Sequence, residues 1–239
     1  RRSKRYRKQT ADFLREGACH ERRRPLPQPC VPFVSAMIQA FPRRLYEADT
    51  AEAARRLLGC RLVREVDGER MAGIIVETEA YLGTEDLGCH SARGRTNRTE
   101  VMFGPPGHAY VYLIYGMYYC LNVVTRPEGD PQAVLIRAME PVEGLERMRR
   151  NRSRRQRKSS PVDRGLANGP GKLCQALGID GSFNGVDLAG KALRIELMPP
   201  VPNQDIAAGP RIGIAYAGEW AEKPLRFWIR GNPCVSTKG

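Results

Sequence analysis

Several features are missing from this 239-residue sequence, and each absence excludes a class of protein. No run approaches the ~20 apolar residues that a membrane-spanning helix requires, which excludes an integral membrane protein. Hydrophobic residues make up 41% of the chain, enough to form a core, so a wholly disordered chain is excluded as well. At this length we expect one large domain, or at most two small ones.

Cysteine and histidine patterns argue against disulfide and metal sites. The seven cysteines are odd in number and widely scattered, and none occurs in a C-x-x-C pair. A disulfide framework and a zinc ribbon are therefore not indicated, and a reducing compartment is favoured. With only three histidines, a metal cluster would have to be assembled without the usual ligand spacing, from Cys89, His90, His108 and Cys120. We expect no metal site.

Common catalytic signatures are missing too. The segment GPGKL at 169–173 resembles a phosphate-binding loop, but that motif requires Gly at 166 and Ser or Thr at 173, and both positions are leucine. No G-x-S-x-G hydrolase elbow occurs. Pro233-Cys234 is not followed by the C-x-x-C half of a zinc deaminase motif.

The net charge of +13 is concentrated in two segments. Residues 1–44 carry 12 basic and 3 acidic side chains, and 147–158 carry 8 basic and no acidic ones. Such runs bind polyanions in some proteins and are merely solvated in others, so charge alone leaves both interpretations open. The Arg- and Pro-rich start predicts a disordered basic tail over 1–40, followed by a folded domain over 41–239.

The body of the chain is predicted to contain both helices and strands. Asp49 and Glu52 form a capping-box pattern that starts a helix, and Gly59 is placed to end it. Residues 62–66 and 71–82 predict a β-hairpin around the turn Asp67-Gly68. Because side chains alternate along a strand, we expect two opposite faces in the second strand: one with Glu77, Glu79 and Tyr81, the other with Val76, Thr78 and Ala80.

Residues 83–107 form a Gly-, Arg- and Thr-rich loop whose length is typical of a functional segment. The aromatic and β-branched residues of 108–124 predict two strands hinged near Gly116, with Tyr115 at or beside the tip. Further strands are expected at 132–138 and twice in the last forty residues (RIGIAYAGEW and LRFWIRG), with helices at 142–152 and 170–177. Strands outnumber helices without a βαβ rhythm, which predicts an α+β fold with a mostly antiparallel sheet.

A set of polar and aromatic residues on these strands and loops points to nucleobase handling, because rings stack on aromatic faces and phosphates attract Lys and Arg. Taken alone, each has an ordinary structural explanation: tyrosines in strands are commonly half-buried sheet residues. The set consists of Glu79, Tyr81, His90, Tyr112, Tyr115, Asn122 and Arg137.

Long motifs in a fixed order, covering about residues 44–235, resemble the alkyladenine (3-methyladenine) DNA glycosylase family. They are VETEAYLG, HSARGRTNRTEVMFGPPGHAYVYLIYGMYYCLNVV, VLIRAMEPVEGLERMR, NGPGKLCQALGI and AGEWAEKPLRF. The resemblance implies a single α+β domain with a curved sheet, peripheral helices and a protruding β-hairpin. It also implies a base-excision-repair enzyme that flips alkylated or deaminated purines from duplex DNA and hydrolyses the N-glycosidic bond with activated water, leaving an abasic site.

By the family pattern, Glu79 is the general base, with Glu77 as its rival, and Arg137 helps to hold the water. Tyr81, His90 and Tyr112 match the positions that sandwich the flipped base, and Asn122 matches the residue that disfavours guanine. Tyr115 matches the residue that inserts into the DNA. The backbone candidates are Lys172, Arg93 and Arg95, with Arg98 beside them.

The resemblance further implies a monofunctional enzyme, since no lysine is expected in the pocket to form a Schiff base. We expect a monomer that needs no cofactor and acts on damaged double-stranded DNA. The location would be cytoplasmic in a bacterium, which we favour, or nuclear in a eukaryote. Two alternatives stay open: a non-catalytic nucleic-acid-binding domain of the same fold, and an accessory domain for tRNA modification or formyl transfer.

Overall fold

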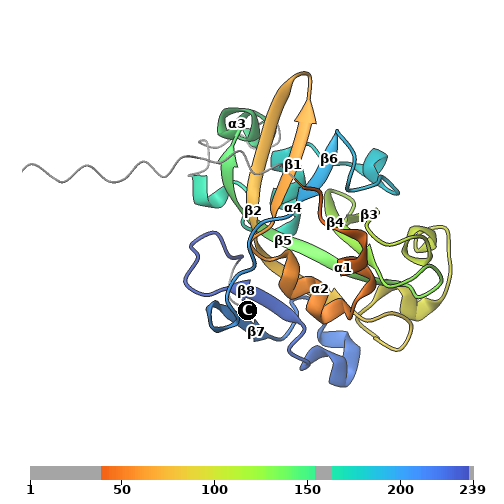
Figure 1. Ribbon diagram of the computed structural model, residues 1–239. Helices are drawn as coiled ribbons and strands as arrows, with labels where there is room; N and C mark the ends of the chain where they lie inside the picture. The colour runs from red at the N-terminus through yellow and green to blue at the C-terminus, as the bar shows by residue number, and fades with distance from the viewer. Residues whose placement is uncertain (1–38, 154–162, 237–239) are drawn as a thin grey trace, which may run out of the picture. The chain divides into compact units, whose positions relative to one another are not determined.

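The computed structural model describes residues 39–153 and 163–236. Two antiparallel strands, β1 (Arg61–Val66) and β2 (Glu69–Tyr81), form the expected hairpin. Its turn residues Asp67 and Gly68 both have positive φ angles, 53° and 75°, as a tight hairpin turn requires. Figure 1 shows these two strands side by side as a long hairpin, and β2 also pairs antiparallel with β5 (Gln132–Glu143).

One mostly antiparallel sheet holds the eight described strands, as the sequence predicted. Its main path runs β3–β4–β5–β2–β1–β6, while β8 pairs with both β2 and β7. The strands not yet introduced are β3 (Ala109–Ile114), β4 (Tyr118–Thr125), β6 (Leu193–Glu196), β7 (Ile206–Gly209) and β8 (Arg226–Ile229).

Four α-helices accompany the sheet in the part of the chain that the structure describes. They are α1 (Arg43–Glu47), α2 (Thr50–Leu57), α3 (Leu145–Ser153) and α4 (Pro170–Leu177). The predicted helix boundaries hold for α2, where the Asp49 side chain accepts a hydrogen bond from the Glu52 N–H at 3.0 Å. They also hold for α4, which ends at Gly178 in the left-handed conformation.

Short 3-10 helices occupy the connecting loops. They are η1 (His90–Arg93), η2 (Glu100–Phe103), η3 (Asp163–Gly165), η4 (Gly181–Phe183), η5 (Asn203–Asp205) and η6 (Ala215–Ala221). The long loop 83–107 contains the first two of them, so it is more ordered than a simple connector.

The two faces of the sheet have different roles. One face packs α2 and α4 into the main hydrophobic core, to which Leu121 of β4 and Ile136 of β5 contribute. Thr78 faces the same way, because its hydroxyl donates to the Ala54 carbonyl of α2 at 3.0 Å. The opposite face carries a smaller cluster that includes Tyr110 and Ala133. The alternation of each strand therefore separates the core from the second face, where the predicted site residues lie.

Three predicted details were wrong. The helix expected at 142–152 begins only at Leu145, because β5 extends through Val142 and Gly144 turns the chain with a φ of 73°. The strand expected at 211–220 is a loop followed by η6, since Gly213 (φ 84°) and Gly218 (φ 59°) break an extended conformation. Val76 lies at a β-bulge and packs with Ala138 and Cys234 outside the main core, which Ala80 does join.

The five described cysteines are all buried, free thiols. Over the described ranges, no helix combines the length and the apolar character needed to cross a membrane. The predicted tail over 1–40 lies almost entirely outside the described residues, so that boundary stays a prediction.

Candidate active site

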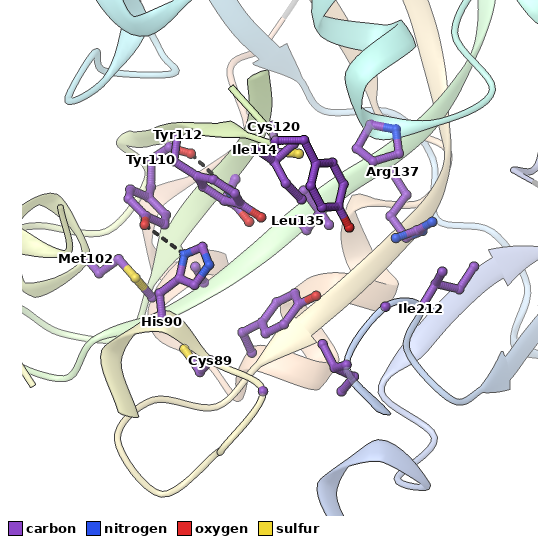
Figure 2. Close-up of a pocket in the computed structure, with 18 of the residues that line it drawn as sticks. Cys89, His90, Met102, Tyr110, Tyr112, Ile114, Cys120, Leu135, Arg137 and Ile212 are labelled. Carbon is purple, nitrogen blue, oxygen red and sulfur yellow. Dashed lines mark hydrogen bonds between the residues drawn. The ribbon is translucent and has the colours of Figure 1, made fainter. Parts of the chain in front are cut away.

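A cavity of about 280 Å³ opens on the face of the sheet opposite α2 and the main core. Its floor is built from alternate residues of four strands. Because side chains alternate along a strand, those on one face of the sheet pack into the core and those on the other face line the cavity. The strand residues in its lining are Tyr81, Tyr110, Tyr112, Ile114, Cys120, Asn122, Ala133, Leu135 and Arg137. Loop residues, among them His90 and Ile212, complete the walls (Figure 2).

Strand register places the key residues in one row across the sheet. Tyr110 pairs with Asn122, Asn122 with Leu135, and Leu135 with Glu79. Residues from β3, β4, β5 and β2 thus lie in one row across the sheet, and the Glu79 carboxylate is at its β2 end.

Glu79 is fully buried directly beneath the cavity lining and has three partners from that lining. Its Oε1 accepts from the Ile212 backbone N–H at 2.7 Å and lies 3.1 Å from an Arg137 guanidinium nitrogen. Its Oε2 accepts from the Tyr81 hydroxyl at 2.9 Å. Burial and the Glu79 carboxylate raise the pKa of Tyr81 well above its ordinary value, so the phenol stays protonated as a donor.

Glu77, the rival carboxylate, lies in a different environment. Its Oε1 contacts Arg137 Nε at 2.9 Å and Arg226 Nε at 2.8 Å. The Ser236 hydroxyl donates to the same oxygen at 2.9 Å, and the Ser236 N–H donates to Oε2 at 2.7 Å. Of these partners only Arg137 lines the cavity. Glu77 therefore holds Arg137 together with residues that do not line the cavity, whereas Glu79 is held by residues that themselves form the cavity wall.

Arg137 joins the two carboxylates. Burial lowers the pKa of its guanidinium, but the charges of Glu79 and Glu77 outweigh burial, so the pKa is raised overall. Figure 2 shows its guanidinium at one end of the cavity, away from His90 and the tyrosines of β3. The arrangement fixes a cation and an anion side by side at this end.

Aromatic rings form the other end. The His90 and Tyr112 rings meet edge-on, with centroids 4.5 Å apart and planes at 75°, and His90 Nδ1 lies 2.9 Å from the Tyr110 hydroxyl. Burial, with the charges of Arg98 and Arg93, lowers the pKa of His90 to about 4, so the imidazole is uncharged at neutral pH. With Tyr81 in the same lining, the three predicted base-binding rings do surround one cavity.

Two further polar groups face this cavity from β4. Asn122 is buried, and its Nδ2 donates to the Tyr110 carbonyl at 3.0 Å, which fixes the orientation of the amide. Burial raises the pKa of the Cys120 thiol to about 11, so it is a neutral thiol at pH 7.

Tyr115 lies at the tip of the β3–β4 hairpin, as predicted. It has a φ of 52°, precedes Gly116 at 67°, and is 84% exposed although it also borders the cavity. A non-glycine residue in the left-handed region is uncommon and is tolerated here in a tight hairpin turn. The geometry presents a bare aromatic ring at the mouth of the cavity.

None of the three predicted phosphate contacts lines the cavity itself. Lys172, in the first turn of α4, donates to Asn168 Oδ1 at 2.9 Å. Arg93 lines a second hollow that shares Cys89, His90 and Tyr216 with the cavity. Arg95 is paired with Glu100 at 2.8 Å and points into solvent, so it is the least available of the three.

The described part of the basic run 147–158 is largely neutralised. Arg147 and Arg150 pair with Glu69, and Arg149 pairs with Glu146 and Asp163. Residues 154–158 of the run lie outside the described ranges.

Sequence reasoning missed the segment around Arg211. Arg211 is buried with Asp86, at 2.5 and 2.7 Å, and donates to the Ala80 carbonyl at 2.9 Å. The next residue, Ile212, donates to Glu79, and so this segment supports both the carboxylate and the adjacent wall. No motif marked it, because its key donor to Glu79 is a backbone N–H and the segment was read as a strand.

The chain is similar to known proteins over most of its length. The methylpurine-DNA glycosylase family matches residues 44–233. A relative from Bacillus cereus (strain ATCC 14579) is 54% identical over 202 residues, which is 82% of this chain and 98% of the relative. Relatives from Bacillus thuringiensis (strain Al Hakam) and Bacillus anthracis (strain CDC 684) are 54% and 53% identical over the same shares. All three are named "Putative 3-methyladenine DNA glycosylase". The chain belongs to the methylpurine-DNA glycosylase family.

Proposed function

We propose that this protein is a monofunctional DNA glycosylase that flips alkylated or deaminated purines out of duplex DNA and hydrolyses the N-glycosidic bond with water. The observation that carries the proposal is the position of Glu79. Its carboxylate is hydrogen-bonded to Tyr81, Arg137 and Ile212 at the wall of a cavity lined by aromatic rings. Family membership supports the same conclusion.

Glu79 acts as the general base in this proposal. As water attacks C1′ of the sugar, its proton passes to the carboxylate, and the electron pair of the breaking bond leaves with the purine. The transition state resembles an oxocarbenium ion, which a nearby anion stabilises. Arg137 holds the carboxylate in place and helps to hold the water. Oε2 has a single described donor, the Tyr81 hydroxyl, and is the oxygen that takes the proton.

The aromatic rings bind the extruded base. The cavity of about 280 Å³ lies close to the lower end of the ~300 to 1,000 Å³ typical of small-molecule sites, which suits a single nucleobase. Stacking on Tyr81, His90 and Tyr112 is worth ~1 to 3 kcal/mol per base, enough to offset the few kcal/mol needed to unstack a damaged nucleotide. Tyr115 fills the gap that the nucleotide leaves in the duplex.

Asn122 contributes selection against guanine. One N–H of its amide is committed to the Tyr110 carbonyl. Asn122 lines the cavity, and in this proposal its second N–H is the donor that meets the bound base. The exocyclic amine of guanine is also a donor, and two donors that face each other leave buried groups unpaired. Purines without that amine avoid this penalty.

Among the described residues no lysine lines the cavity, which supports simple hydrolysis over Schiff-base chemistry with strand cleavage. Lys172 and Arg93 are proposed to contact phosphates, with Arg95 doing so only if it leaves Glu100. We further propose that the protein acts as a monomer. The bacterial relatives support a place in the bacterial cytoplasm.

A panel of duplexes, each with one lesion, tests the proposal. Purified protein is incubated in excess with duplexes that contain hypoxanthine, ethenoadenine or 7-methylguanine. We expect release of the free base and a strand that breaks only after alkali treatment. Tight binding without any base release would favour a non-catalytic DNA-binding domain, and strand breaks without alkali would contradict the monofunctional assignment.

A further inference from the structure

Two arginine side chains lie over tyrosine rings that form the cavity wall. The Arg98 guanidinium carbon is 5.1 Å from the Tyr112 ring centroid, and that of Arg211 is 4.6 Å from the Tyr81 centroid. Both distances are within the range of a cation–π contact. The walls that would hold a flipped base are therefore already engaged with positive charge.

The two arginines differ in how their charge is balanced. Arg211 is buried and paired with Asp86, so its charge is compensated. Arg98 is exposed and lies outside the cavity, in the neighbouring hollow beside Arg93. Within the described residues Arg98 takes part in no ion pair, and its contacts are with the aromatic side chains of Tyr112 and Tyr110. Its charge is therefore the uncompensated one.

The field of Arg98 reaches the cavity. Together with Arg93, it adds to the effect of burial in lowering the pKa of His90. Glu79 supplies the opposing negative charge, but Arg137 lies against it. A charged base between Tyr112 and Tyr81 would therefore meet a guanidinium beside each ring.

Purine lesions fall into two electrostatic classes. Alkylation of a ring nitrogen, as in 7-methylguanine, leaves the base positively charged while it is attached to DNA. Deamination or etheno bridging, as in hypoxanthine and ethenoadenine, leaves it uncharged. A bare tyrosine face attracts the first class, but a face that already binds a guanidinium attracts a second cation less, because like charges repel.

We propose that Arg98 is a specificity-determining residue that shifts this enzyme toward uncharged purine lesions and away from cationic ones. The inference rests on the proposed glycosylase function and deepens it, since it names the class of substrate that the site favours.

The test compares Arg98→Gln with Arg98→Lys, which keeps the charge. Single-turnover release of 7-methylguanine and of hypoxanthine is measured in the same duplex sequence at saturating protein, with spontaneous base loss subtracted. We expect Arg98→Gln to raise the ratio of 7-methylguanine to hypoxanthine release by about two- to fivefold, the size of an exposed cation–π contact. Arg98→Lys should stay nearer to the wild-type ratio.

Arg93→Gln is the matched control, because Arg93 lines the same hollow but is not positioned over a tyrosine ring. Arg93→Gln should weaken binding of both duplexes alike and leave the ratio of 7-methylguanine to hypoxanthine release near the wild-type value. If Arg98→Gln also lowers both rates equally and flattens the salt dependence, Arg98 is a phosphate contact and the inference is wrong. An equal rise of the ratio in both variants would likewise refute a role for the contact with Tyr112.

The same ratio is also measured in binding, by competition of the two duplexes for each variant. Absence of base release from either duplex by the wild-type protein would refute the proposed function. The inference would then be decided by binding alone: a relative affinity that Arg98→Gln leaves unchanged would overturn it.

Discussion

The buried centre beneath the cavity and the exposed rim around it differ in solvent exposure and in the number of partners that their side chains have. In the centre, Glu77, Glu79 and Arg137 are almost inaccessible to solvent, and each has several partners. At the rim, Tyr115 is 84% exposed and Arg98 lacks a described ion-pair partner. The centre is organised by folding itself, whereas the rim keeps groups open for contact with DNA. Chemistry and DNA recognition should therefore respond separately to mutation.

The largest expected effect is in the centre, on chemistry. Glu79→Gln keeps the shape of the side chain but removes the proton acceptor, so single-turnover excision should fall by about 10² to 10⁴-fold, the range for a general base. Affinity for lesion-containing duplex, measured by fluorescence anisotropy, should stay within a few-fold of wild type. Normal excision by the folded variant would contradict the assignment of the base.

For Glu77, the expected effect of mutation is on the free energy of unfolding. Glu77→Gln removes the only described ion-pair partner of Arg226 and leaves Arg137 with Glu79 alone, and breaking a buried ion pair in this way costs about 3 to 5 kcal/mol. Urea denaturation followed by circular dichroism measures that loss. A stability loss as large in Glu79→Gln as in Glu77→Gln would remove the distinction between the base and its anchor.

Much of the fold and part of the site were predictable because they follow local patterns. The alternation along β2 correctly placed Glu77, Glu79 and Tyr81 toward one site, and the turn at Gly116 placed Tyr115 at a hairpin tip. Capping residues set the limits of α2 and α4 for the same reason, since they act within a few neighbouring residues.

The rest depends on contacts between distant segments. Nothing local states that Asn122 pairs with Leu135 and Leu135 with Glu79, because register is decided by the whole sheet. The same holds for Ile212, whose backbone N–H reaches Glu79 from 133 residues away. Its segment looked like a strand by composition, and only the two glycines with positive φ show why it is a loop.

The rim prediction concerns Tyr115. Tyr115→Ala removes the exposed ring and nothing from the buried centre, so stability should change little. Damage-specific binding should weaken by about 1 to 3 kcal/mol, the value of one stacked ring. The check is the ratio of affinities for lesion and undamaged duplex, with Tyr115→Phe as a control that restores stacking. Equal affinity ratios in the alanine variant and wild type would contradict the wedge role.

A smaller effect is expected from a single phosphate contact. Lys172→Gln should reduce the slope of log affinity against log salt by about one, because one fewer counterion is released. Arg147→Gln is the control, since Arg147 is already neutralised by Glu69 and Asp67 and should leave the slope unchanged. If both variants alter the slope equally, the position of Lys172 beside the cavity has no special part in DNA binding.

The smallest effect concerns His90 and joins the two regions, because this ring belongs to the cavity but is influenced by the rim arginines. Its pKa is lowered to about 4, chiefly by burial, from an ordinary value of 6.5. Between pH 6.5 and pH 4, His90 is therefore protonated in the unfolded chain but not in the folded chain. The stability associated with His90 is complete above pH 6.5 and is lost as pH falls toward 4. After allowance for partial exposure, we expect a loss of less than about 1 kcal/mol at pH 5.5, which lowers the melting temperature by at most about 2 to 4 °C.

His90→Gln cannot titrate, so its melting temperature should fall less than that of wild type between pH 7 and pH 5.5. Parallel decreases in the two proteins would show that the ring is free to protonate in the folded state, and the cavity wall would then carry a positive charge of its own.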